Sequence, residues 1–128
     1  MQVPSWLAGL ACLLLGLSPA RAEPAGDPQR GEQIYSRCMG CHSLQVNRTG
    51  PRHCGLIGRR AGTVPGFDYS AAMRESGLVW DQDTLDAFLA APMDRVPGTT
   101  MTYAGIADPQ QRRELIAWLA TAAGQCAE

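Results

Sequence analysis

The stretch Cys38–His42, with the sequence Cys-Met-Gly-Cys-His, constrains this chain more than any other part of it. Two thiols separated by two residues and followed at once by a histidine form a pattern typical of covalent haem c attachment. Each thiol can add to one vinyl group of the same porphyrin, and the imidazole then lies beneath the iron. The pattern therefore predicts a fold that wraps one haem and supplies a sixth ligand to its iron.

The same two thiols could instead serve a zinc site or a redox dithiol. A structural zinc site requires four ligands, commonly with a second close pair, and Cys12, Cys54 and Cys126 form no such pair. A thioredoxin-like dithiol requires a βαβ pattern, and no run of β-branched residues flanks the motif. Haem attachment is the prediction, and zinc or dithiol chemistry is the alternative.

The beginning of the chain has the pattern of a secretory signal. Residues 6–17 are almost all apolar, and the small-residue sequence Ala20-Arg21-Ala22 follows, as at a cleavage site. We therefore expect a signal peptide, Met1–Ala22, and a single domain over residues 23–128. The apolar run is short for a membrane span. Because no Lys or Arg precedes it, an uncleaved N-terminal anchor is the alternative.

Export also bears on the cysteines that the haem motif does not use. Disulfides persist in oxidising compartments outside the cytoplasm. We expect Cys12 to leave with the signal, so Cys54 and Cys126 remain as an even pair. We hypothesise that they form a disulfide between the loop after the motif and the end of the chain. Two free thiols, or an intermolecular bond through Cys126, are the alternatives.

The charge balance limits the partners of the protein. Its formal net charge is −1, and every one of the 11 basic residues is an arginine. A nucleic-acid-binding domain would carry a basic stripe, which this balance does not favour. Docking to other proteins would have to use arginines or acids, because the chain has no lysine.

Local helix signals predict an all-α fold of three main helices, one or two short helices and long loops. Asp27-Pro28 and Asp108-Pro109 each combine an N-cap residue with a proline suited to the first helical turn. Gly31, Ile34, Tyr35 and Cys38 recur at helical spacing, which would put Cys38 on the apolar face of the first helix. The other expected boundaries are a short helix over 69–76 that stops at Gly77, a helix from Asp81 to Pro92, and a last helix that ends at Gly124.

The residues alone leave the sixth ligand open. Met39 lies inside the motif and cannot reach the other face of the ring, so Met73, Met93 and Met101 remain. Met101 lies in a loop of Gly, Pro and Thr, where a core methionine is less expected. A ligating His42 also needs an acceptor for its second N–H, and a carbonyl of the loop 49–59 would serve. His53 lies in that loop without a partner motif, and we expect a structural role for it.

With these residues in this order, the chain resembles the class I c-type cytochromes, the small soluble monohaem electron carriers. The resemblance covers essentially all of the chain after the expected signal. It is carried by the haem motif and by Gly31 and Tyr35, Thr49-Gly50-Pro51, Gly58-Arg59, Tyr69, Trp80, Pro97-Gly98-Thr99-x-Met101 and Leu115-Ile116-x-Trp118-Leu119. It implies a cytochrome c fold, with helices and long loops wrapped around one covalent haem.

The resemblance also implies the roles of single residues. Cys38 and Cys41 would bind one haem c covalently, and His42 and Met101 would ligate its iron. The Pro51 carbonyl would accept a hydrogen bond from His42. The groups expected around the propionates are Arg59, Tyr69 and Trp80, with the Thr99 hydroxyl added on the methionine side.

The function implied is that of an exported, periplasmic carrier of single electrons and not that of an enzyme. Such a protein shuttles electrons between larger redox enzymes or respiratory and photosynthetic complexes, docking transiently at the haem edge. It is expected to be a monomer, to bind no nucleic acid and to stay out of the membrane after signal cleavage. The alternatives are a dedicated cytochrome subunit of one periplasmic dehydrogenase, and a five-coordinate haem protein that binds small ligands or turns over peroxide.

Overall fold

The computed structural model describes residues 1–2 and 25–126. The expected signal peptide, Met1–Ala22, falls almost wholly outside the described residues, so its cleavage stays a prediction. Residues 25–126 contain helices and loops but no strand, apart from one isolated bridge between Arg60 and Val79. The predicted all-α class is confirmed.

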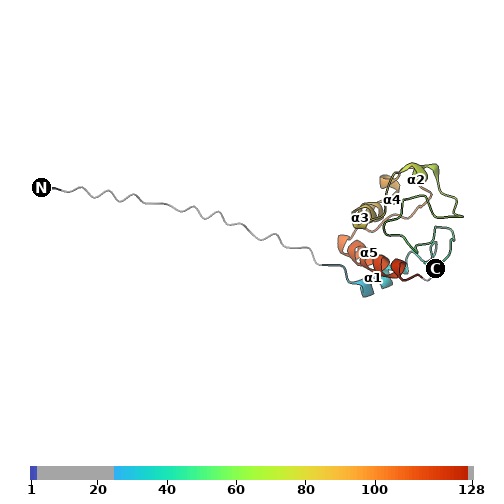
Figure 1. Ribbon diagram of the computed structural model, residues 1–128, viewed down its shortest axis with the longest axis horizontal. Coiled ribbons are helices and arrows are strands. Elements are labelled where there is room, and N and C mark those ends of the chain that lie inside the picture. Colours follow the sequence, from blue (N-terminus) through green and yellow to red (C-terminus); the bar gives the residue numbers. More distant parts are fainter. Residues whose placement is uncertain (3–24, 127–128) are drawn as a thin grey trace.

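Three longer helices carry the fold of the described residues, and two short ones join them. The longer helices are α1 (Pro28–Tyr35), α3 (Gln82–Ala90) and α5 (Pro109–Gly124). The short ones are α2 (Ala71–Glu75) and α4 (Pro92–Arg95). In Figure 1, α1 lies along α5 on one side of the molecule, α2, α3 and α4 lie on the other, and long loops run between them.

The two terminal helices begin as the sequence predicts. The Asp27 carboxylate accepts from the backbone N–H two residues on (2.9 Å), Asp108 does the same (2.8 Å), and a proline follows each cap. The helices then pack closely at Gly31. A Cβ there would lie 2.0 Å from the backbone oxygen of Glu114 and 2.7 Å from Cβ of Trp118. Only a residue without a side chain allows this approach.

The first helix ends earlier than predicted. It stops at Tyr35, and Cys38 lies in the turns that follow, so placing Cys38 on the helix itself is wrong. The reason is a change in hydrogen bonding, because Arg37 N–H donates to Ile34 and Cys38 N–H donates to Tyr35, three residues back (3.0 and 2.8 Å). Such tight turns are common at helix ends. Cys38 still packs against the core, as its apolar spacing suggested.

The middle helices follow their local signals. The Ser70 side chain caps α2, and Gly77, at φ +70°, turns the chain after it. Asp81 forms a capping box with Thr84 at the start of α3. The helix ends at Ala90, and α4 begins at Pro92, whose missing N–H suits a first turn.

A disulfide joins the loop after the motif to the end of α5. Cys54 and Cys126 are bonded across a sequence separation of 72 residues, which confirms the hypothesised pair. The backbone N–H of Gly55 also donates to the Ala123 carbonyl (3.0 Å). The loop is therefore fixed to the last helix by one covalent bond and one hydrogen bond.

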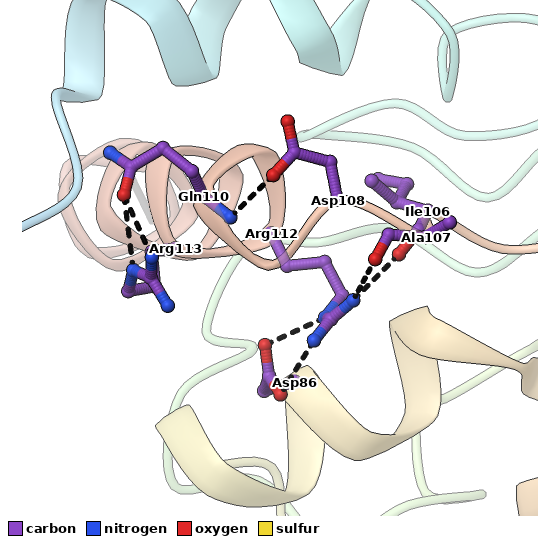
Figure 2. A network of polar contacts seen from close by, with 7 residues as sticks. All are labelled: Asp86, Ile106, Ala107, Asp108, Gln110, Arg112 and Arg113. Atoms are coloured by element: carbon purple, nitrogen blue, oxygen red, sulfur yellow. Dashed lines mark hydrogen bonds and ion pairs between the residues drawn. The ribbon is translucent and has the colours of Figure 1, made fainter. Parts of the chain in front are cut away.

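One arginine connects α5, α3 and the segment of Ile106 and Ala107. Arg112 of α5 forms an ion pair with Asp86 of α3 (Nε to Oδ1, 2.8 Å) and donates through Nη1 to the carbonyls of Ile106 (2.8 Å) and Ala107 (3.0 Å) (Figure 2). Only 12% of its side chain is exposed. Arg112 thus fixes the segment that leads from the loop containing Met101 into α5.

The buried side chains form one apolar core between the helices. It includes Leu56, Leu85, Leu89, Ile106, Leu115, Ile116 and Leu119. None of the helices in the described part is both long and apolar enough to cross a membrane.

Candidate functional site

A cavity of about 440 Å³ opens into this core. Its volume lies in the range of roughly 300–1,000 Å³ usual for pockets that hold small molecules and cofactors. All of the predicted site residues line it, namely Cys38, Cys41, His42, Pro51, Arg59, Tyr69, Trp80, Thr99 and Met101. The fold thus brings together residues from the motif, the following loop, the region before α3 and the loop after α4.

His42 forms one wall of the cavity and is 8% exposed. Its Nδ1 lies 2.8 Å from the Pro51 carbonyl oxygen. A carbonyl can only accept, so Nδ1 carries the proton and Nε2 keeps its lone pair when the ring is neutral. Burial lowers the pKa of His42, while the Pro51 bond opposes this, so the neutral form is favoured at pH 7. A neutral imidazole with a free Nε2 is the form that ligates a metal.

Gly50 and His53 lie against the His42 ring. A Cβ on Gly50 would be 2.3 Å from Cε1 of His42, so only glycine leaves room for the ring. The His53 ring stacks on it, with centroids 4.2 Å apart and planes inclined by 21°. Burial, together with the neighbouring His42 and Arg59, lowers the pKa of His53 to about 3, so His53 is neutral at pH 7.

The two motif thiols are free, whereas Cys54 and Cys126 are bonded to each other. Cys38 is half-buried, and its burial raises the pKa of the thiol to about 11. Cys41 is exposed. Both line the cavity beside His42, so a group bound there could be reached by either thiol.

Two of the three candidate methionines, Met73 and Met101, line the cavity. Met39 and Met93 are 55% and 48% exposed and lie outside the lining. Met73 is on α2 and 7% exposed, as part of the core. Met101 is half-buried in a loop, where its backbone N–H donates to the Thr99 hydroxyl (3.2 Å).

The side of the cavity near Arg59 is polar. The Arg59 guanidinium donates to the carbonyls of Cys54 (2.8 Å) and Arg52 (3.1 Å), and its Nε is buried without a hydrogen-bond partner among the described residues. Burial lowers the pKa of Arg59, which the nearby Tyr69 opposes. A buried, unpaired N–H on a half-buried cation suits an anionic group on this side of the cavity.

Tyr69 and Trp80 complete this side. The Tyr69 hydroxyl accepts from the Val64 backbone N–H (3.3 Å), and burial raises the pKa of Tyr69. Trp80 is 7% exposed and packs on the Phe88 ring, with centroids 5.0 Å apart. Both side chains line a cavity whose wall also includes five leucines, namely Leu56, Leu85, Leu89, Leu115 and Leu119.

These features test whether a haem suits the site. A porphyrin is a flat apolar ring with two carboxylates on one edge. The cavity offers an aliphatic wall, a buried arginine donor at one end, free thiols at its mouth and a nitrogen donor on one side. The residues present therefore suit this group, and their individual roles stay predictions.

Sequence reasoning missed the contact between His53 and the predicted ligand. The sequence predicted a structural role for His53, and its ring is half-buried and lines the cavity. The hydrogen bond between His53 Nδ1 and the Tyr35 hydroxyl (3.0 Å) and the stack on His42 depend on the path of the loop. No motif in the sequence signals that path.

Known proteins share sequence and fold with this chain. Residues 28–123 match the family described as Cytochrome c. Cytochrome c2 of Rhodomicrobium vannielii is 48% identical over 111 residues, which cover 83% of this chain and 87% of that protein. Cytochrome c2 of Blastochloris viridis is 38% identical over 114 residues, covering 87% of each. The solved structure of cytochrome cH from Methylobacterium extorquens matches with a TM-score of 0.74 and 41% identity, over 75% of this chain and 99% of that one.

Proposed function

Because the chain belongs to the cytochrome c family, we propose that it carries single electrons with one haem c bound through Cys38 and Cys41 and ligated by His42 and Met101. It is an electron carrier of this family and not an enzyme. The Fe(II)/Fe(III) couple of the bound haem supplies the redox chemistry. The chain contributes attachment, ligation, charge compensation and exclusion of water.

The hydrogen bond from His42 to Pro51 is the observation that carries the proposal. It leaves Nε2 of His42 as the donor atom, holds the ring in the cavity wall and increases its basicity as a ligand. The neighbouring free thiols, Cys38 and Cys41, are the residues that would form the two thioether bonds.

Met101 is the proposed ligand on the other side. Met39 and Met93 are unsuitable as iron ligands because they are exposed to solvent and do not line the cavity. Met73 lines the cavity, but it belongs to the apolar core and is held on a helix. A loop can move its side chain to the iron with less rearrangement than a helix can. Together with the four porphyrin nitrogens, two protein ligands would complete the six coordination positions of the iron, which suits electron transfer and opposes ligand binding or peroxide turnover. A thioether ligand also raises the reduction potential relative to a second histidine.

The propionates would lie at the polar end of the cavity. Arg59 offers a half-buried cation with one buried, unpaired N–H, and Tyr69 and Trp80 offer a hydroxyl and an indole N–H. Thr99 would add a hydroxyl on the methionine side. Compensation of this kind is required, because unpaired buried charge is costly.

An absorption spectrum of the oxidised protein tests the ligand set. The bond between ferric iron and a methionine sulfur gives a weak far-red band, which we expect in the wild type. Met101→Ala should abolish the band, whereas Met93→Ala, a change at an exposed methionine outside the cavity, should keep it. Persistence of the band in Met101→Ala, or its loss in Met73→Leu, would refute Met101 as the ligand.

We also propose that the protein acts in the bacterial periplasm as a monomer that docks transiently to redox partners. The Cys54–Cys126 disulfide supports an oxidising compartment, and the relatives include cytochromes c2 of bacteria. Residues 1–22 would be removed, leaving the domain 23–128. N-terminal sequencing of the protein from a periplasmic fraction tests this, since a chain that begins at Met1 in the membrane fraction would refute it.

A further inference from the structure

His53 has no part in the proposed function, yet its ring touches the residue on which that function depends. It stacks on His42 with centroids 4.2 Å apart and planes only 21° from parallel. A stack this close excludes water from one face of the His42 ring. The contact joins two histidines that are separated by a loop, so it depends on how that loop is held.

The loop around His53 is fixed by contacts on both sides. The backbone N–H of His53 donates to the Ser43 carbonyl (3.0 Å), and that of Cys54 donates to Leu44 (2.9 Å). The disulfide then ties the next residue, Cys54, to Cys126 in the segment that follows α5. The backbone of His53 therefore has little freedom to carry its ring away from His42.

The ring of His53 is fixed as well. Its Nδ1 is hydrogen-bonded to the Tyr35 hydroxyl (3.0 Å). Tyr35 is 5% exposed, and its own ring packs on Trp118 with centroids 4.3 Å apart. Through Tyr35, the orientation of His53 is set by the packing between α1 and α5.

The stack of His53 on His42 limits a movement that the Pro51 hydrogen bond allows, namely the tilt of the His42 ring. That bond fixes the direction of the Nδ1–H group of His42 but allows the ring to tilt about it. A second ring lying flat against His42 opposes this tilt, because tilting would drive the two rings into each other. The hydrogen bond and the stack together define the plane that contains Nε2.

We propose that His53 is a positioning residue that sets the plane of the His42 imidazole and thereby its orientation towards the haem iron. The proposal rests on the proposed function, because it takes His42 to be the proximal ligand. The unpaired electron of low-spin ferric haem is distributed according to the plane of its axial imidazole. The paramagnetic shifts of the haem methyl groups and the EPR g-values therefore report on this plane.

The test compares variants of the full-length holoprotein. His53→Phe keeps a flat ring but loses the Tyr35 bond, whereas His53→Leu keeps apolar bulk and loses the ring face. Ile116→Ala is the control, since it weakens the core at a buried residue that does not line the cavity. We expect His53→Leu to shift the haem methyl resonances and g-values, His53→Phe to stay close to the wild type, and the control to match the wild type.

Each outcome decides between the alternatives. Wild-type spectra in His53→Leu would overturn the proposal, and so would equal shifts in His53→Leu and in the control. If His53→Leu does not mature, His53→Met replaces it, because methionine adapts to irregular space but has no ring. If neither His53→Leu nor His53→Met matures while His53→Phe does, the ring of His53 is required for folding only, and the proposal is also overturned. Failure of the proposed function is separate, since the wild type itself would then lack a low-spin, covalently bound haem.

Discussion

Removal of the Cys54–Cys126 disulfide should be the largest change in stability available without touching the cavity. The bond closes a loop with a sequence separation of 72 residues, and neither cysteine lines the cavity. In the chain-entropy treatment, a cross-link of this span destabilises the unfolded state by about 4 kcal/mol at 25 °C. The proposed covalent haem would not change this estimate, because its two proposed attachment residues, Cys38 and Cys41, are separated by only two residues and close no long loop.

The measurement is urea unfolding of the holoprotein, followed by far-UV circular dichroism at pH 7. The double variant Cys54→Ala/Cys126→Ala should lose about 4 kcal/mol of unfolding free energy relative to the wild type. Its m-value should also rise, because the unfolded chain without the cross-link exposes more surface. The single variant Cys54→Ala is the matched control and should behave as the double variant does.

Removal of the disulfide should leave the other native contacts of the loop in place. The hydrogen bond from Gly55 to the Ala123 carbonyl does not involve a cysteine side chain, so it should survive in the variants. The absorption spectrum of the bound haem should therefore be the same in these variants as in the wild type. A stability loss below about 1 kcal/mol together with an unchanged m-value would refute the argument that the bond acts on the unfolded chain.

Three further predictions concern the helices. Gly31→Ala should lower the free energy of unfolding, measured by urea titration, by about 1–3 kcal/mol, because its Cβ would lie 2.0 Å from the α5 backbone. The control Gly124→Ala, which has open space around its Cβ, should leave this free energy unchanged or raise it. Arg112→Ala should cost about 2–3 kcal/mol through loss of charged hydrogen bonds, measured by thermal unfolding. Asp81→Ala should lower the melting temperature at pH 7, and the difference should vanish in acid. The Thr84 hydrogen bonds lower the pKa of Asp81, so its contribution is complete above the ordinary value of 3.8 and is lost as the pH falls through the lowered value.

The beginnings of the helices were predictable because their signals are local. The caps at Asp27, Asp81 and Asp108 each act within three residues, so no knowledge of the fold is needed to recognise them. The end of α1 was less predictable. The spacing from Gly31 to Cys38 continues past the helix, because the tighter turns that follow keep the same side facing the core.

The residues around the cavity could be assembled from the sequence only through the family resemblance. Periodicity places Met73 as readily as Met101 near an apolar interior, and it gives no position for Arg59. The contacts of His53 and Arg112 were out of reach, because each joins segments that only the fold brings together. The His53 stack depends on the loop path, and the Arg112–Asp86 pair spans 26 residues between α3 and α5.

The two sides of the cavity are held by different kinds of contact. On the His42 side, Arg59 binds two loop carbonyls, a disulfide joins the loop to α5, and the His53 ring covers the imidazole. On the Met101 side, the loop lacks helical structure and is held by hydrogen bonds, among them those from Met101 to Thr99 and from Ile106 to Leu89 and those of Arg112 beyond its end. Loops with few buried contacts open at lower free energy than cross-linked ones. We therefore expect the loop that carries Met101 to open at lower free energy than the cross-linked loop beside His42.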